Sequence, residues 1–212
     1  MEKIGVIGSW VVGQTLCKGF ITHGYEVMIG SRNTSKIEEW KEKSDVKTLI
    51  GNLEETAKFG EIIALAVKGN AAVEALKIAG GENLNEKIII DATNPISDEP
   101  PINGVLNFFT SLDKSLMEQL QEEFPKAYFV KAFNSIGNTL MVNPDFNGVK
   151  PTMFICGNNN DAKKEVSKIL HLFGFEVEDM GNAESARAIE PLCMLWCIPG
   201  FLRNDWSHAF KL

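Results

Sequence analysis

Two glycines near the amino terminus frame a turn that could bind a dinucleotide. The apolar run at residues 3–7 leads into Gly8, and Gly13 opens a segment with helical periodicity. In a G-x-G-x-x-G turn between a strand and a helix, the glycines permit close packing and the free helix N–H groups bind a pyrophosphate. Trp10 takes the place of the middle glycine. Its indole either turns outward over the site or fills it, so the turn alone leaves dinucleotide binding and a purely structural role equally open.

The end of the next apolar run indicates which dinucleotide would bind. Ser31, Arg32 and Asn33 follow residues 26–30, Lys36 lies one helical turn later, and no Asp or Glu stands where an NAD ribose hydroxyl is normally held. Because a guanidinium grips phosphate with two hydrogen bonds, the 2′-phosphate of NADP is the natural ligand. In the alternative interpretation, Arg32 is a surface cation and residues 31–34 only cap the following helix.

Short runs rich in Ile and Val alternate with segments of helical periodicity, which is typical of βαβ units around a parallel sheet. The run from Ile62 to Val67 is apolar at successive positions, as in a central strand covered on both faces. Strands are predicted at 3–7, 26–30, 46–50, 61–67, 87–92 and 127–132. Helices are predicted at 11–23, 35–43, 53–58, 70–79 and 112–123. We therefore expect an α/β fold with a doubly wound, mainly parallel sheet.

The remainder of the chain predicts a smaller unit on the same core. Strands are expected at 152–156 and 175–179, and helices at 160–172 and from about 183 to 198. We expect residues 1–137 to form a nucleotide-binding domain and residues 138–212 a small C-terminal α/β extension. The proline-rich loop at 93–104 follows a strand's carboxyl end, where such sheets bind ligands, so it is either a lid or a plain connection. The aromatic segment 201–212 suggests docking, for example against a partner subunit.

Composition excludes several classes of function. The net charge of −7 and the pI near 5.1 disfavour nucleic acid and anionic membrane surfaces as partners. The four cysteines form no C-x-x-C pair and the three histidines form no ligand cluster with them, so we expect neither a metal site nor disulfides. The start of the chain leaves no room for a signal peptide, and no apolar run approaches the ~18 residues of a membrane span. We expect a cytoplasmic protein.

Five blocks of sequence follow one another along the chain: 4–13, 29–33, 91–95, 130–137, and 174–175 continuing through 186–192. The most specific parts are T-N-P at 93–95 and K-A-F-N-S-I-G at 131–137. Taken in order, the five blocks resemble the coenzyme F420-dependent NADP oxidoreductase family. The departures from its pattern are Trp10 for the usual glycine and Val11 for the usual polar residue. The STEAP metalloreductases look like a more distant relative through their cytoplasmic reductase domains.

The resemblance implies an NADP(H)-binding Rossmann domain and direct hydride exchange with a second carrier, either coenzyme F420, which is a deazaflavin, or a flavin. It implies a pyrophosphate turn of Gly8, Ser9, Trp10, Val11 and Val12 and a 2′-phosphate site of Ser31, Arg32, Asn33 and Lys36. It places Val67 and Lys68 beside the ribose and phosphates, and Asn94, Pro95, Ala132, Asn134, Ser135 and Ile136 around the nicotinamide. Because hydride transfer between two held rings requires no protein nucleophile or general acid, no catalytic side chain is assigned.

Two other functions stay open from the sequence. In the first, the chain is a Rossmann module that senses a nucleotide or binds a partner, with weakened or lost catalysis because Trp10 occupies the pyrophosphate space. In the second, it is a β-hydroxyacid or imine reductase. That function is disfavoured because only about 75 residues follow Gly137, too few for a long helical second domain. The family and the apolar C terminus also lead us to expect a homodimer, whereas the acceptor and the direction of the reaction are not determined.

Overall fold

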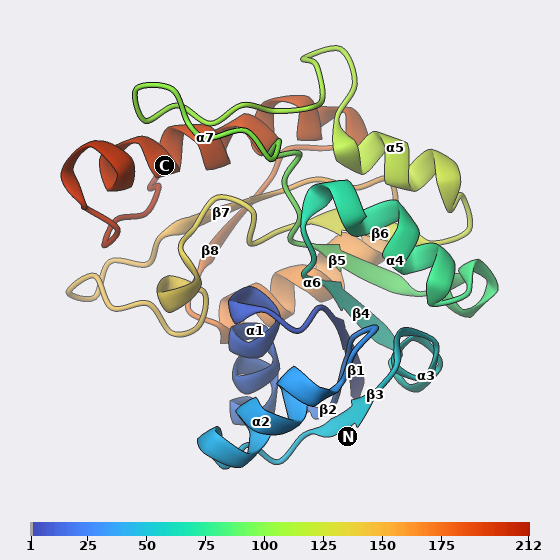
Figure 1. Cartoon of the computed structure of the whole chain (residues 1–212). Coiled ribbons are helices and arrows are strands. Elements are labelled where there is room, and N and C mark those ends of the chain that lie inside the picture. Colours follow the sequence, from blue (N-terminus) through green and yellow to red (C-terminus); the bar gives the residue numbers. More distant parts are fainter. Residues whose placement is uncertain (1) are drawn as a thin grey trace.

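The computed structural model describes residues 2–212 and contains a six-stranded parallel sheet in the order β3-β2-β1-β4-β5-β6 (Figure 1). This order places the first strand in the middle, where the direction of winding reverses, so the predicted doubly wound α/β fold is confirmed. The strands are β1 (Lys3–Ile7), β2 (Glu26–Gly30), β3 (Leu49–Gly51), β4 (Ile62–Leu65), β5 (Ile88–Asp91) and β6 (Tyr128–Lys131).

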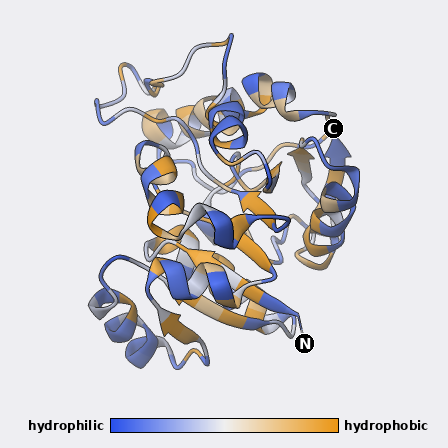
Figure 2. Cartoon of the chain, turned by 90° about the vertical axis from the view of Figure 1, so that its right-hand side faces the viewer, coloured by the Kyte–Doolittle hydropathy of each residue, from blue (hydrophilic) through white to orange (hydrophobic). Residues whose placement is uncertain are grey.

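Helices cover both faces of this sheet. On one face, α1, α2 and α6 pack their apolar sides into a core that contains Phe20, Ile37 and Val166. On the other, α3, α4 and α5 contribute Leu53, Leu76 and other buried side chains. Figure 2 shows hydrophobic strands at the centre and hydrophilic residues along the outer helices. The helices are α1 (Val11–Thr22), α2 (Ser35–Ser44), α3 (Leu53–Phe59), α4 (Ala72–Ile78), α5 (Leu116–Glu123), α6 (Asn160–Leu172) and α7 (Ala186–Arg203).

The C-terminal residues add a two-stranded parallel sheet of β7 (Thr152–Ile155) and β8 (Glu176–Asp179) beside β6. The Lys131 N–H donates to the Cys156 carbonyl at 3.0 Å, which joins the two sheets at the end of β6. Phe173 and Phe175 pack against Phe133 with ring centroids 5.8 and 6.1 Å away. Short 3-10 turns precede or follow several helices: η1 (Gly69–Ala71), η2 (Gly81–Leu84), η3 (Asn138–Leu140) and η4 (Ala183–Ser185).

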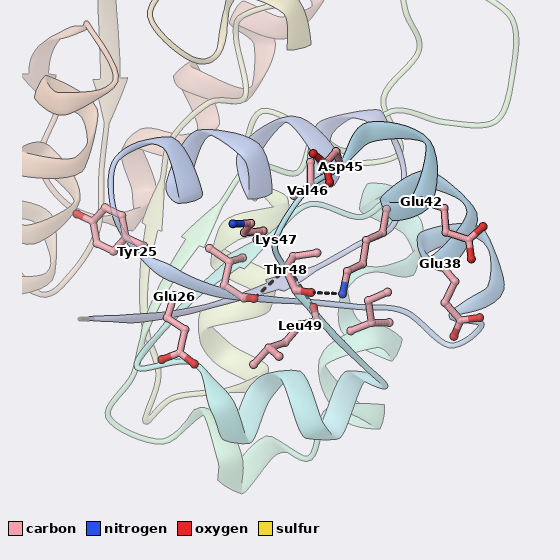
Figure 3. Close-up of a pocket in the computed structure, with 12 residues that line it drawn as sticks. Tyr25, Glu26, Glu38, Glu42, Asp45, Val46, Lys47, Thr48 and Leu49 are labelled. Carbon is pink, nitrogen blue, oxygen red and sulfur yellow. Dashed lines mark hydrogen bonds between the residues drawn. The ribbon is translucent and has the colours of Figure 1, made fainter.

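Three predicted elements differ from those observed by three or more residues. The helix predicted at 112–123 begins at Leu116, because the Ser115 side chain accepts the Glu118 N–H and caps the helix there. The third strand was expected at 46–50 but spans 49–51, because the Thr48 hydroxyl donates to the Val27 carbonyl at 3.0 Å and the Lys41 ammonium binds the Thr48 carbonyl at 2.7 Å. These side-chain bonds take the place of backbone pairing between the strands. The residues involved line an open cavity of about 860 Å³ at the amino-terminal end of β2 (Figure 3). The last helix continues to Arg203 through Pro191 and Pro199, where a stop near 198 was expected.

The chain's last residues fold back onto α7. Asn204 adopts a left-handed conformation with φ of 53°, which reverses the direction of the chain. The Trp196 indole N–H then donates to the His208 carbonyl at 2.8 Å, and the Thr152 N–H donates to the Phe210 carbonyl at 2.8 Å. The aromatic terminal segment therefore docks on its own chain. Across residues 2–212, no helix combines the length and apolarity that a membrane crossing requires.

Candidate functional site

A trough follows the carboxyl ends of the parallel strands. Its first part, the Arg32 cavity, has a volume of about 160 Å³ and is lined by Gly8, Ser31 and Arg32. The second part, the loop cavity, has a volume of about 230 Å³ and shares Val67 and Lys68 with the first. The third part, the amide cavity, has a volume of about 480 Å³ and shares Ala92 and Asn94 with the second. The shared walls make the three cavities one continuous site, at the edge where doubly wound sheets bind their ligands.

The turn between β1 and α1 needs its two outer glycines and tolerates its tryptophan. Gly8 has φ of +134°, and a Cβ atom there would lie 2.2 Å from the Ala66 carbonyl oxygen. A Cβ atom at Gly13 would lie 2.0 Å from the Gly8 carbonyl oxygen. Trp10 has an extended backbone, which any residue can adopt, and is 70% exposed. The structure thus decides between the two orientations of the indole, which turns outward, with the Lys36 ammonium 5.0 Å from its ring centroid.

The Arg32 cavity brings together polar groups from two strand ends. The Ser9 hydroxyl donates to the Ser31 hydroxyl at 3.1 Å, which links the β1 and β2 turns. The Asn33 side chain accepts the Ser35 N–H at 3.0 Å just before α2, whereas Arg32 takes no part in this turn. The Arg32 side chain is exposed and has no hydrogen bond or ion pair with any other described residue. Glu74, from α4, is a carboxylate on the wall of the same cavity.

The long loop forms a wall of the loop cavity. Ile96, Ser97 and Asp98 line it, and Asp98 pairs with the Lys68 ammonium at 3.4 Å. The Asn70 side-chain amide donates to the other Asp98 oxygen at 2.9 Å. These exposed contacts contribute little to stability, since surface ion pairs contribute about 0–1 kcal/mol. They nevertheless place the loop against the site.

Two asparagines from neighbouring strand ends meet in the amide cavity. The Asn94 side-chain amide donates to the Asn134 carbonyl at 2.7 Å, and the Asn134 amide donates to Asn94 Oδ1 at 3.2 Å and to the Ile189 carbonyl at 3.0 Å. Phe133, at φ of 63°, reverses the chain after β6 so that Asn134 reaches the cavity. Asn134 is 3% exposed, and its Oδ1 atom has no partner among the described residues. A buried acceptor without a partner is costly, so this atom is suited to receive a donor from a ligand.

Most of the predicted site residues meet in the trough, but some do not line it. Val12, Asn94, Asn134 and Ile136 line the amide cavity. Residues that line the Arg32 cavity are Gly8, Ser9, Trp10, Ser31, Arg32, Val67 and Lys68. Residues outside the three linings are Val11, Asn33, Lys36, Pro95, Ala132 and Ser135. Ala132 and Ser135 are buried behind the cavity wall, where they support the turn that carries Asn134.

Sequence reasoning missed the outer wall of the amide cavity. Cys193, Trp196 and Cys197 reach it from α7, and Trp206 reaches it from the terminal segment. From the sequence, these α7 residues were assigned to no ligand site. The signal that was present is the i, i+3, i+4 spacing of the three α7 residues, which puts them on one helix face. That spacing does not specify which cavity the face lines.

Under the amide cavity lies a buried network of charges that the sequence analysis also missed. The Lys131 ammonium binds Asp91 Oδ2 at 2.7 Å, Glu190 Oε1 at 3.0 Å and the Thr93 carbonyl at 2.9 Å. The three charged side chains are 0–2% exposed. Burial lowers the pKa of Lys131, but Asp91 and Glu190 outweigh this effect and raise it, so the ammonium stays charged. The sequence did contain a signal for this pair. Asp91 and Lys131 carry opposite charges and each ends an apolar strand, and the two strands, β5 and β6, pair in register.

The network joins four elements around the site. Glu190, on α7, also accepts the N–H groups of Leu116 and Met117 at 3.0 Å each, at the amino end of α5. These N–H groups have no partner within the helix, and the positive end of the helix dipole favours the carboxylate. Nearby, Arg187 binds Glu118 of the α5 capping box through Nε at 3.0 Å. As a result α5, α7, β5 and β6 hold fixed positions beside Asn94 and Asn134.

Comparisons with known proteins are consistent with this geometry. Residues 3–95 match the family described as NADP oxidoreductase coenzyme F420-dependent. A solved structure of a candidate F420-dependent NADP-reductase from an Arthrobacter strain superposes with a TM-score of 0.92 at 29% identity, covering 100% of this chain and 99% of that one. An imine reductase of Streptomyces aurantiacus superposes with a TM-score of 0.68 at 14% identity, covering 95% of this chain and 63% of that one, which shows a shared fold alone.

Curated relatives include metalloreductases. Metalloreductase STEAP3 of Rattus norvegicus is 29% identical over 204 residues, covering 94% of this chain and 39% of that protein. Metalloreductase STEAP2 of Homo sapiens is 30% identical over 191 residues, covering 89% of this chain and 35% of that protein. The chain therefore spans little more than a third of the length of these relatives. Within residues 2–212, no group of three or more His, Cys, Asp or Glu side chains is placed to hold a metal ion.

Removal of the central cation tests the buried network. We expect Lys131→Met to lower the free energy of unfolding by about 3–5 kcal/mol, because it leaves two carboxylates buried without their counter-charge. Denaturant unfolding followed by circular dichroism measures the loss. Lys164→Met, on the exposed face of α6, is the matched control and should change stability by less than about 0.5 kcal/mol. A loss below about 1 kcal/mol for Lys131→Met would show that the network does not hold these elements together.

Proposed function

We propose that the chain is a member of the coenzyme F420-dependent NADP oxidoreductase family, whose model matches residues 3–95. We further propose that it binds NADP(H) along the trough and exchanges hydride with a second redox carrier. The observation that carries this proposal is the polarity of the trough. One end offers the cation Arg32, which has no partner among the described residues, and the other end offers two neutral amides. A dinucleotide with phosphates at one end and an uncharged carboxamide at the other matches this order. The proposal includes a cytoplasmic location, where free thiols such as those of this chain stay reduced.

The Arg32 cavity fits the phosphates of NADP(H). The turn after β1 brings the free N–H groups at the start of α1 to the cavity, and the first turn of α1 has no acidic side chain to repel an anion. Arg32 and Ser31 supply donors for the 2′-phosphate. Trp10 contributes indirectly, because its exposed indole holds the Lys36 ammonium near this end through a cation–π contact.

The amide cavity fits the nicotinamide. The buried Asn134 Oδ1 atom would accept a hydrogen bond from the carboxamide, which would give this atom the partner it lacks. The Asn134 side-chain amide donates to Asn94 Oδ1 and to the Ile189 carbonyl, and the Asn94 amide donates to the Asn134 backbone carbonyl, so both the side chain and the backbone of Asn134 are held in place. This arrangement defines the orientation of the ring.

Hydride transfer places modest demands on the protein. The cofactor supplies the hydride chemistry, and the donor and acceptor carbons must be held about 3–3.5 Å apart. The residues of this chain would bind the two rings, orient them through Asn94 and Asn134, and exclude water with Ile136, Met141 and the indoles of α7 and the terminal segment. No proton transfer by a side chain is required.

The lining of the amide cavity favours a flat, uncharged ring as the second substrate. Trp196 and Trp206 form one wall, and the described residues that line the cavity include no charged side chain. Aromatic rings stack on indole faces, and a buried fixed charge would be costly there. A deazaflavin or flavin ring meets these requirements.

We also propose that two copies of the chain associate through an apolar surface of α7 and the 96–112 segment. The loop tip contacts the end of α7, since a Cβ atom at Gly104 would lie 3.0 Å from the Leu202 side chain. Figure 1 shows this segment running beside α7. Contiguous apolar patches of this kind mark interfaces on soluble proteins. The exposed apolar side chains of the surface are Ile102, Val105, Phe109, Leu112, Leu195, Phe201 and Leu202.

Light scattering tests the association. At micromolar concentration we expect the protein to have twice the 23.4 kDa mass of one chain, and the double variant Leu112→Glu/Leu195→Glu to have the mass of a single chain. Leu172→Glu, at the end of α6, is the control and should stay dimeric, because Leu172 is about as exposed as Leu195 but lies outside the surface. A monomeric parent protein would refute the proposed interface.

Cofactor preference tests the Arg32 cavity. We expect calorimetric titration to give much tighter binding of NADPH than of NADH, and Arg32→Ala to weaken NADPH by about 1.5–3 kcal/mol, roughly ten- to hundredfold. The affinity for NADH should stay nearly unchanged, because NADH has no 2′-phosphate. Lys43→Ala, on the outer face of α2, is the control for a general loss of positive charge. Equal affinity of the parent protein for both cofactors would contradict the proposal.

Trp10 separates this proposal from the alternative of a module with an occluded site. Because the indole points outward, we expect Trp10→Gly to weaken NADPH binding only by the cation–π contribution of about 0.5–1 kcal/mol. In a Lys36→Ala background the same substitution should have no further effect. If Trp10→Gly instead creates NADPH binding that the parent lacks, the chain is a module whose tryptophan blocks the site.

A further inference from the structure

Two thiols face the amide cavity from one side of α7. Cys193 and Cys197 are four residues apart, so they lie on the same helix face, and both line the cavity. Cys193 is 7% exposed, whereas Cys197 is only partly buried. The hydride transfer proposed above uses neither thiol. Their common position in a ligand cavity, beside the unpartnered buried Asn134 Oδ1, calls for a role of their own.

The two thiols are not equivalent. The neighbouring Cys193 side chain lowers the pKa of Cys197, whereas the Cys197 side chain and burial raise the pKa of Cys193. In contrast, burial raises the pKa of Cys17 to about 11 and that of Cys156 to about 12. The thiolate is the nucleophilic form of cysteine, so Cys197 combines access with activation while Cys17 and Cys156 have neither.

The helix keeps the pair from forming a disulfide. Residues at i and i+4 on a helix have Cβ atoms about 5–6 Å apart, whereas a disulfide requires about 3.5–4.5 Å. Closing that gap would require α7 to distort around Trp196, which is held by its hydrogen bond to the His208 carbonyl. Cys193 therefore remains a thiol, and Cys197 remains free to react with a partner from the cavity.

The cavity selects the kind of partner. The described side chains that line it are apolar, aromatic, amide, hydroxyl or sulfur groups, so it favours small, flat and uncharged compounds. We propose that Cys197 is a modification site for α,β-unsaturated carbonyl compounds, such as enones and quinones, that enter the amide cavity. In this step the Cys197 sulfur forms a bond to the β carbon, the carbon–carbon π bond breaks, and the resulting enolate takes a proton from water. No oxidant or reductant is needed.

Alkylation kinetics test the site without any cofactor, so the result does not depend on the proposed function. N-ethylmaleimide, itself an unsaturated dicarbonyl, is added to the intact protein and the adducts are mapped by peptide mass spectrometry over pH 6–9. We expect Cys197 to react at least ~10-fold faster than Cys17, Cys156 and Cys193. Cys197→Ser should remove this fast phase. Labelling of Cys197 no faster than that of the buried Cys17 and Cys156 would overturn the proposal.

Substitutions at Cys193 test its effect on Cys197. Cys193→Ala should move the pH midpoint of Cys197 labelling upward and slow the reaction at pH 7, whereas Cys193→Ser keeps a donor and should preserve the parent profile. Thermal unfolding of both variants establishes that they fold. An identical pH midpoint in the folded parent and Cys193→Ala proteins would refute activation by Cys193. A loss of rate in Cys193→Ser as large as in Cys193→Ala would refute it as well.

Discussion

The buried interaction of Lys131 with Asp91 and Glu190 is the constraint on which the ligand-facing edge of this protein depends. A single ammonium satisfies two carboxylates from different elements, and one of these carboxylates also receives the first N–H groups of α5. Burying three charges is costly, and an apolar core of the same volume would be as stable or more so. The charges instead determine how the surrounding elements are positioned. Directional bonds fix α7 and the turns after β5 and β6 relative to one another, and these three segments form the walls of the amide cavity.

The amino-terminal turn shows a different kind of constraint, one of space. Gly8 and Gly13 lie where any Cβ atom would overlap backbone, so the close approach of β1, α1 and β4 depends on them. The middle position faces outward and has an ordinary extended conformation, which explains how an indole fits there. The tryptophan also holds Lys36 beside the phosphate-binding end. Tryptophan in place of the usual glycine therefore leaves the turn intact and adds a contact that holds the Lys36 ammonium beside it.

The two ends of the trough suit different parts of the chemistry. The exposed cations Arg32 and Lys36, which follow β2, could capture a phosphate, and their position at the surface keeps the cost of desolvating them low. The lining of the amide cavity is uncharged and partly aromatic, which would suit two rings that stack with water excluded. Its outer wall comes from α7 and the folded-back terminal segment, and the same wall supplies two thiols, of which Cys197 is the more accessible. The proposed binding of a carrier and the proposed thiol chemistry would thus share one cavity.

The sequence by itself determined the order of the elements, the doubly wound sheet and the turns that hold Ser31, Arg32 and Asn94. These features follow from local periodicity, from glycine positions and from the rule that parallel strands end at one edge. Tertiary structure alone decided the rest. The orientation of Trp10, the pairing of Lys131 with Glu190 and the approach of Cys197 and Trp206 to Asn134 all depend on contacts between residues far apart in the chain. Periodicity shows that a side chain is buried or faces one side of a helix, but its partner is set only when the elements pack.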